Sequence, residues 1–219
     1  MEFFDTLKFP PNRREFPFLL ESFLLLCYTF GKYRKKKGGD AVLGMFYPRE
    51  RAADVFAIDY QKLYDLGYRA VLFDIDNTLV HHGDDSTAQV DALFLQIHQI
   101  GLKTMLVSNN GVDRIERFLR CIDSPYIANA DKPDPTCCRR AMETLNVTPN
   151  ETVFIGDQVF TDILCANRCG MASFLVDFIR VPNETKIGIR RHVERVILWC
   201  WRLCRPRRKR IGDIWKEGL

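Results

Sequence analysis

The sequence contains no internal repeat and no low-complexity tract, so repeat architectures and compositionally biased chains are excluded. Its apolar run at residues 16–30 is too short for a comfortable membrane span, and it contains Glu21. No clear cleavage site follows this run, so we do not expect a secretory signal. With 219 residues, 47% of them hydrophobic, the chain has room for one α/β domain and terminal extensions.

The eight cysteines lack the spacing of a metal site, because the sequence has no CxxC pair and no His near the cysteines. Cys137 and Cys138 are adjacent and cannot easily pair with each other. Two further pairs have helical i, i+4 spacing inside apolar runs: Cys165/Cys169 and Cys200/Cys204. We therefore expect reduced thiols in a cytosol-like compartment, where they pack as small apolar residues.

Charge is distributed unevenly along the chain, although the net value is only +4. Residues 1–40 carry eight Lys and Arg against five acids, residues 41–185 carry thirteen against twenty, and residues 186–210 carry ten against one. This pattern predicts an amphipathic, basic extension at 1–40, a domain at 41–185, and a basic amphipathic helix and tail at 186–219. Basic flanks favour an anionic surface. We expect a membrane and no nucleic acid, because no known nucleic-acid-binding module is present.

Two segments in the flanks have the periodicity of amphipathic helices. Residues 16–30 repeat apolar side chains at i, i+3 and i+4, and a basic run and a Gly-Gly hinge follow them. Residues 193–204 contain two Trp among Arg residues. A helix with aromatic and basic residues suits the interface of an anionic membrane. The alternative for 193–204 is a helix packed on the core, with a solvated basic tail after it.

The central part of the chain alternates between strand-length apolar runs and helical patterns. The predicted strands are 70–75, 103–107, 153–156 and 172–176, and the predicted helices are 60–66, 87–100, 112–121, 135–145 and 160–169. Such alternation predicts an α/β fold with right-handed βαβ units and a parallel sheet flanked by helices. Ligands of these sheets bind at the carboxyl ends of the strands, so the residues after each apolar run are the candidates for chemistry.

Polar residues follow the predicted strands at four places. Asp74 and Asp76 come directly after the first strand, and two carboxylates in that position are costly unless a cation relieves their repulsion. Alone, each place has an ordinary structural interpretation, such as a solvated turn or a helix N-cap. The other places are, in chain order, Thr78 in the same loop, Ser108 and Asn109 after the second strand, Lys132 before a helix, and Asp157 and Asp162 after the third strand.

Together, these residues provide several acids, hydroxyl groups and one lysine at one edge of the sheet. This set is what phosphoryl transfer requires. Acid-bound Mg²⁺ and a lysine offset the charge of a phosphate, and a carboxylate can attack phosphorus.

The order of the motifs resembles the haloacid dehalogenase (HAD) superfamily, which has DxDx(T/V), a Ser/Thr, a Lys and an acidic pair. The segments 73–80, 107–110 and 156–162 are similar to the IIIA-type, YqeG-like subfamily, and so is the stretch from Thr185 to Arg195. The resemblance covers about residues 43–200 and leaves the first forty residues unexplained.

The resemblance implies a HAD-like Rossmannoid sheet and a role for each motif residue. Asp74 would be the nucleophile and a metal ligand, and Asp76 the general acid and then the base, grouped with the metal-binding acids. Thr78, Ser108 and Asn109 would bind phosphate or orient the acids. Lys132 would pair with Asp74 and phosphate. Asp157 would be a Mg²⁺ ligand, and Asp162 would support the metal.

The spacing of the motifs leaves no room for a cap domain, since 34 positions separate Asp74 from Ser108 and 24 separate Ser108 from Lys132. An uncapped site cannot enclose a small metabolite, so it favours a phosphate on a protein, a nucleic acid or a membrane lipid. YqeG-like relatives include phosphatidylglycerophosphate phosphatases, so the resemblance and the basic flanks together predict a phosphorylated lipid substrate at an anionic membrane. We expect a cytoplasmic protein bound peripherally to the inner face of the membrane, or to the matrix side in a mitochondrion. Two alternatives stay open, namely a phosphatase of a soluble or protein phosphoester and a membrane-associated binding protein with the same fold.

Overall fold

The structure is a computed structural model that describes residues 44–179, 189–204, 211 and 214–216. The chain divides into two units, Met1–Gly44 and Met45–Leu219. The predicted helix at 16–30 and the basic tail at 205–210 lie outside the described residues. Among the described helices, none has both the length and the apolarity to cross a membrane.

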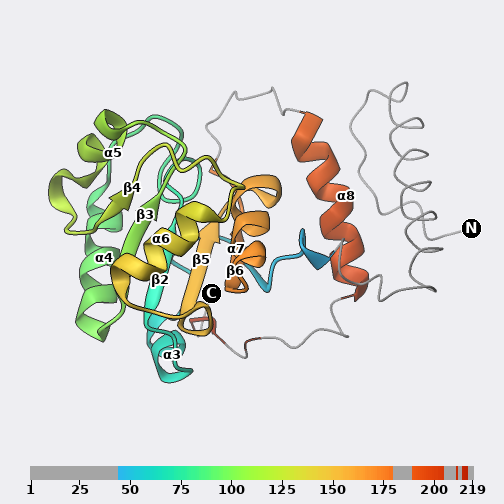
Figure 1. The fold of residues 1–219 in the computed structure, drawn as a ribbon, viewed down its shortest axis with the longest axis horizontal. Coiled ribbons are helices and arrows are strands. Elements are labelled where there is room, and N and C mark those ends of the chain that lie inside the picture. Colours follow the sequence, from blue (N-terminus) through green and yellow to red (C-terminus); the bar gives the residue numbers. More distant parts are fainter. Residues whose placement is uncertain (1–43, 180–188, 205–210, 212–213, 217–219) are drawn as a thin grey trace, which may run out of the picture. The chain divides into compact units, whose positions relative to one another are not determined.

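A six-stranded, fully parallel sheet forms the centre of the second unit, with strand order β1-β6-β5-β2-β3-β4 (Figure 1). Its strands are β1 (Glu50–Ala52), β2 (Ala70–Phe73), β3 (Lys103–Val107), β4 (Tyr126–Ile127), β5 (Thr152–Gly156) and β6 (Ala172–Val176). The four predicted strands are confirmed, and the sheet is the predicted α/β type. The two edge strands were missed because two or three residues are too few to produce a periodic pattern. β2 also ends at Phe73, two residues before its predicted end, because the chain turns into a loop at Asp74.

The helices that connect these strands follow the predicted pattern closely. They are α3 (Tyr60–Asp65), α4 (Ala88–Ile100), α5 (Val112–Phe118), α6 (Thr136–Leu145), α7 (Leu164–Arg168) and α8 (Ile189–Cys204), with short turns η1 (Leu119–Cys121), η2 (Pro149–Glu151) and η3 (Val159–Ile163). The predicted helix at 160–169 is the exception, since its first half is the π-helical turn η3. There the carbonyl of Gln158 accepts from the N–H groups of both Asp162 and Ile163, at 3.0 and 3.2 Å.

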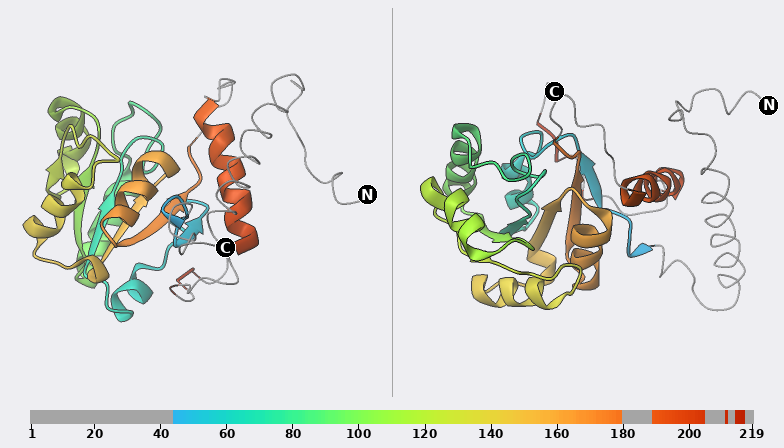
Figure 2. Two further views of the ribbon diagram at one scale, coloured as in Figure 1. Left: turned by 45° about the vertical axis from the view of Figure 1, so that its right-hand side comes forward. Right: turned by 90° about the horizontal axis from the view of Figure 1, so that it is seen from above.

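Two apolar layers cover the two faces of the sheet. Alternate residues of β2 point to opposite faces, so that Val71 and Phe73 join one layer and Leu72 joins the other. The first layer contains side chains of α3, α4 and α5, and the second contains side chains of α6 and α7. Figure 2 shows α6 and α7 together on one side of the strands. This packing leaves the carboxyl ends of the strands free for a site.

Helix α8 packs on the domain through one face and exposes the other. Glu194, Ile197 and Trp201 are buried, at i, i+3 and i+7. The exposed side chains include Arg195, Trp199 and Arg202, at i, i+4 and i+7 on the other face. The open alternative of a helix packed on the core is therefore correct for the first face, while a face with Trp and Arg still meets solvent.

Candidate active site

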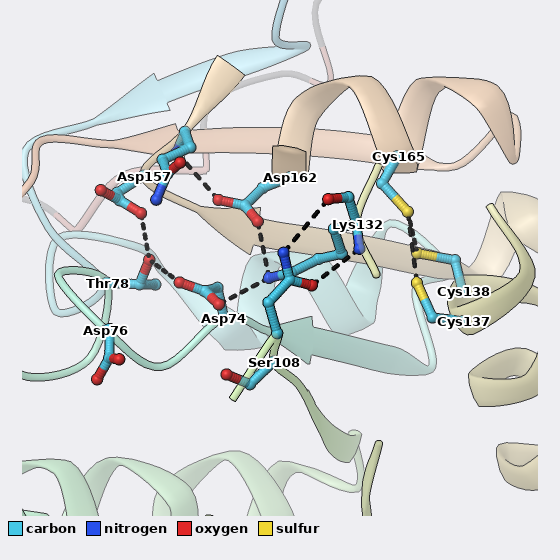
Figure 3. Close-up of polar contacts among 12 residues, drawn as sticks. Asp74, Asp76, Thr78, Ser108, Lys132, Cys137, Cys138, Asp157, Asp162 and Cys165 are labelled. Atoms are coloured by element: carbon cyan, nitrogen blue, oxygen red, sulfur yellow. Dashed lines mark hydrogen bonds and ion pairs between the residues drawn. The ribbon is translucent and has the colours of Figure 1, made fainter. Parts of the chain in front are cut away.

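The motif residues converge at the carboxyl edge of the sheet (Figure 3). Asp74 follows β2, Ser108 follows β3, and Asp157 follows β5. Lys132 lies in the loop between β4 and α6. Because β5, β2 and β3 are neighbours in a parallel sheet, residues up to 83 positions apart in the sequence come together here.

Lys132 lies between two buried carboxylates. Its Nζ is 2.7 Å from Oδ1 of Asp74 and 2.8 Å from Oδ1 of Asp162, and the three side chains are between 1% and 10% exposed. Burial raises the pKa of Asp74 to about 6 against the opposing effect of Lys132. Burial also disfavours the charged form of Lys132, but Asp162 and Asp74 outweigh it, so the pKa of this ammonium group is raised. One cation is thus fixed beside two acids.

Asp157 completes a group of three buried acids with Asp74 and Asp162, in which one oxygen of each lies within 4.8 Å of the others. Burial, with Asp162 nearby, raises the pKa of Asp157 to about 7, and Arg191 on α8 opposes the rise. The hydroxyl of Thr78 lies 3.4 Å from both Asp74 Oδ2 and Asp157 Oδ1. This donor set fits Mg²⁺, because three carboxylate oxygens converge in one buried place and hard cations prefer oxygen ligands.

The backbone around Gly156 and η3 brings Asp162 into this group. A Cβ on Gly156 would lie 2.5 Å from Cβ, Cγ and Oδ2 of Asp162, so only glycine leaves room for the carboxylate. The N–H of Gln158 donates to Asp162 Oδ2 at 3.0 Å. The wide turn of η3 and the small residue before Asp157 therefore place the second acid of the motif.

Asp76 belongs to a different environment, and Figure 3 shows its carboxylate turned away from Asp74. It accepts from Asn110 Nδ2 at 2.7 Å and Arg114 Nη2 at 2.8 Å, and His82 Nδ1 lies 3.0 Å away. Burial alone would raise the pKa of Asp76, but the hydrogen bond from Asn110, with those from Gly83 and Arg114, lowers it. The Asp76 carboxylate is thus not part of the group of Asp74, Asp157 and Asp162, and its role as a metal ligand stays a prediction.

The two polar residues after β3 have separate roles. Ser108 is buried, and its Oγ accepts from the N–H and Nδ2 of Asn110 at 3.2 and 3.0 Å. Asn109 Oδ1 accepts from the N–H of Lys132 at 2.8 Å, and its Nδ2 donates to the carbonyl of Lys132 at 3.3 Å. Both ends of the Asn109 amide therefore contact the Lys132 backbone, so this residue positions the lysine loop.

Arg114 and Arg191 are site residues that the sequence reasoning did not single out. Arg114 on α5 reaches Asp76, and Arg191 on α8 pairs with the Asp157 carboxylate and donates to the Asp157 carbonyl at 2.6 Å. Each lies 34 or more positions from its partner, so spacing alone could not connect them. The one available signal for Arg191 was its place in the stretch that resembles the end of the YqeG-like subfamily.

Three cysteines pack behind the lysine loop, as the right of Figure 3 shows. Cys165 Sγ lies 3.2 Å from Cys138 Sγ and 3.6 Å from Cys137 Sγ, and the carbonyl of Asp134 accepts from Cys137 and Cys165. All three are buried in the apolar layer of α6 and α7. Their sulfur atoms lie within 4.8 Å of one another, a grouping that could hold a metal ion and that the sequence spacing did not predict, so their role as small apolar residues stays a prediction. Their convergence was not foreseen, because they come from two helices 27 or more positions apart.

Comparison with known proteins gives the same class as the fold and the site. A family model described as HAD-hydrolase-like matches residues 129–178. "Probable phosphatase YqeG" of Bacillus subtilis (strain 168) is 32% identical over 154 residues, which are 70% of this chain and 90% of that protein. The chain therefore belongs to the HAD family of phosphatases, as the motifs indicated.

Solved structures with a similar fold are more distant. One is an uncharacterized protein from Listeria monocytogenes serotype 4b, with a TM-score of 0.43 and 18% identity, over 60% of this chain and 97% of that chain. Another is a HAD family hydrolase from Deinococcus radiodurans R1 with bound phosphate and sodium, with a TM-score of 0.41 and 14% identity, over 52% of this chain and 93% of that chain.

Proposed function

We propose that this chain is a Mg²⁺-dependent phosphatase that forms an aspartyl-phosphate on Asp74 and converts phosphatidylglycerophosphate to phosphatidylglycerol at an anionic membrane surface. The observation that carries the proposal is the buried contact of Lys132 with Asp74 and Asp162, beside Asp157. A nucleophilic carboxylate, a fixed cation and an acidic metal site are the parts that this kind of phosphoryl transfer needs.

The proposed reaction has two balanced steps. In the first, an oxygen of Asp74 bonds to phosphorus while the bond from phosphorus to the ester oxygen breaks, and the leaving alkoxide takes a proton from Asp76. In the second, Asp76 removes a proton from water, and the water oxygen bonds to phosphorus as the bond from phosphorus to Asp74 breaks. Phosphate is released and both carboxyl groups return to their starting forms.

The surroundings of Asp76 suit the second step directly. Hydrogen bonds from Asn110 and Arg114 hold the pKa of Asp76 low, which favours the ionised form from which the second step starts. The first step requires a proton on Asp76. An incoming phosphate dianion next to Asp76 favours that proton, because like charges raise the pKa of an acid.

The residues of the buried group suit a bound Mg²⁺. Asp74, Asp157 and Asp162 would hold the ion, and Mg²⁺ bound there offsets the charge on the phosphoryl oxygens. The chain itself orders the nucleophile: Lys132 fixes one oxygen of Asp74, and the Thr78 hydroxyl lies 3.4 Å from the other. These contacts limit the rotation of the carboxylate and direct it for attack.

A lipid substrate is supported by the open edge of the sheet and by the exposed face of α8. All residues from Asp74 to Lys132 are described, and they form helices, strands and loops of the sheet domain without an inserted domain. Helix α8 presents Trp199 and Arg202 to solvent, and Trp199 is 52% exposed. An aromatic residue with a cation on one exposed helix face suits the interface of anionic lipid.

A phosphate-release panel tests this function. We expect phosphatidylglycerophosphate in mixed micelles to have a higher kcat/KM than soluble phosphoesters, and we expect EDTA to abolish release until Mg²⁺ is restored.

Flotation with liposomes that contain or lack anionic lipid measures surface binding, with Trp199→Ala as the variant and Leu95→Ala, another exposed apolar side chain, as the control. Equal rates on soluble phosphoesters, together with no flotation, would favour a phosphatase of a soluble or protein phosphoester. Flotation without turnover of any substrate would favour a binding protein. Full activity after chelation would exclude the metal.

A further inference from the structure

A cavity of about 290 Å³ lies beside the acidic group and has no part in the reaction steps above. Its walls come from the carboxyl ends of β1 and β6 and from helix α8. They include Arg51, Asp157, Phe178, Arg191, Arg195 and Leu198. Asp157 lines the cavity and also belongs to the group with Asp74 and Asp162, so the cavity lies next to that acidic group.

The cavity lies on the edge of the sheet where ligands of such sheets bind. β6 ends at Val176 and is hydrogen-bonded to β5, which is followed by Asp157. Asp177 and Phe178 follow β6 directly and line the cavity. A substrate whose phosphate occupies the place next to Asp74 could therefore extend along this edge, under α8.

Three arginines and three acids line the cavity, and the acids pair with only two of the arginines. Arg51 pairs with Asp177, with Nε 2.9 Å from Oδ1, and Arg191 pairs with Asp157 and Glu194. Arg195 is exposed and lines the cavity, and within the described ranges it has no acidic partner. With Mg²⁺ on Asp157, the positive charge at this end of the cavity would increase further.

Two apolar side chains also line the cavity. Phe178 lies under the guanidinium of Arg191, with 4.7 Å from Cζ to the ring centroid, and Leu198 comes from the next turn of α8 after Arg195. A cation and apolar side chains in one cavity suit a short carbon chain that carries an anion. A volume near 300 Å³ is at the small end of ligand sites and matches a head group better than an acyl chain.

We propose that this cavity binds a second anionic group of the substrate, a phosphodiester, with Arg195 as its ligand and with Phe178 and Leu198 against the glycerol that joins the two phosphates. This inference rests on the proposed function, because it names the part of the proposed substrate that the enzyme recognises. Arg191 is a positioning residue between the cavity and the acidic group, since it pairs with the Asp157 carboxylate and donates to the Asp157 carbonyl.

Substrates that differ in the second anion test the subsite. One soluble pair is glycerol 3-phosphate and the deacylated head group, which is a glycerol phosphodiester that carries a terminal phosphomonoester. We expect the wild-type protein to prefer the diester-bearing compound. In Arg195→Gln, the ratio of the two kcat/KM values should fall roughly tenfold, as for loss of a charge-assisted hydrogen bond. Arg195→Lys should retain most of the ratio, and Arg140→Gln, an exposed arginine on α6, should leave it unchanged.

The outcomes separate this inference from the proposed function. If Arg195→Gln lowers the ratio for the soluble pair while lipid and soluble head group are used equally well, the subsite stands and the lipid surface is wrong. Phosphatidic acid, a lipid with a phosphomonoester and no phosphodiester, gives the matching comparison on a surface. If the wild-type protein prefers phosphatidylglycerophosphate over the soluble compounds, the lipid function stands. If Arg195→Gln then lowers the rates on phosphatidylglycerophosphate and phosphatidic acid equally, the subsite is wrong. An unchanged ratio in Arg195→Gln would also overturn the subsite.

Discussion

Two carboxylates two residues apart lie in two different regions of this site. The Asp74 region contains Lys132, Asp157 and Asp162, and burial raises the pKa of Asp74 to about 6. The Asp76 region contains Asn110 and Arg114, whose hydrogen bonds lower the pKa of Asp76. The same residue type is thus prepared for two tasks by its neighbours: the first region binds charge and forms a bond to phosphorus, and the second moves protons.

The largest effect is expected from Asp74→Asn. An amide cannot replace the attacking carboxylate, so turnover should fall by at least about 10⁴-fold, whereas the fold should persist because the side chains are of the same size. Phosphate release measures the rate, and circular dichroism checks the fold. Retention of a tenth of the wild-type rate would rule out Asp74 as the nucleophile.

Lys132→Met should affect both activity and stability. Without the ammonium group, Asp74 and Asp162 are buried together as unpaired charges, so the free energy of unfolding in EDTA should fall by about 3 kcal/mol at pH 8. The loss should be smaller at pH 5, where a carboxyl group can take up a proton. Urea denaturation at the two pH values measures this, with Lys62→Met on α3 as a control; equal losses at both pH values would contradict a charge effect.

Arg114→Gln sharpens the comparison from the other side. The guanidinium helps to keep the pKa of Asp76 low, so its removal should raise that pKa and move the acidic limb of the kcat–pH profile to higher pH. The rate at neutral pH should fall by roughly 10- to 100-fold. Arg117→Gln on the same helix, an arginine that pairs with the exposed Asp85, is the matched control. If the kcat–pH profile of Arg114→Gln has the same shape as that of the wild-type protein, Arg114 does not control the pKa of Asp76.

The smallest effect concerns the stability of the metal-free protein. Asp74 and Asp157 have folded-state pKa values of about 6 and about 7, above the usual 3.8, so the folded protein binds more protons than the unfolded chain between these values. Their contribution to stability therefore decreases as the pH rises from about 4 to about 7. In EDTA the unfolding temperature should therefore fall as the pH rises over this range, and Asp157→Asn should make this pH dependence weaker. Mg²⁺ added at pH 7.5 should raise the unfolding temperature again. A dependence of opposite sign that persists unchanged in Asp157→Asn would contradict the raised pKa values.

The sequence was sufficient for the sheet and for most of the Asp74 region. Asp74, Ser108 and Asp157 each follow a buried strand, and the parallel arrangement of such strands is enough to bring them together. Lys132 was placed by its motif, although its loop follows the two-residue strand β4, which has no periodicity to detect.

The contacts of Asp76, and the contact of α8 with Asp157, could be identified only from the structure. Arg114 and Arg191 lie on helices, and a helix pattern predicts which face is apolar without showing which carboxylate a long cationic side chain reaches. The turn η3 was also hidden, because a π-helical turn and an α-helix have similar apolar patterns over five residues. The sequence therefore identifies the acids more readily than the arginines that control their protonation.

The most direct test of the central claim is to trap the phosphorylated enzyme. Turnover of phosphatidylglycerophosphate by Asp76→Asn, which should form the intermediate and hydrolyse it slowly, is quenched with acid and digested, and the peptide with Asp74 is analysed by mass spectrometry. We predict the added mass of one phosphoryl group on Asp74 and its loss in Asp74→Asn. Phosphate release by the wild-type protein under the same conditions, with no phosphorylated Asp74 at any quench time in either protein, would contradict the aspartyl-phosphate mechanism.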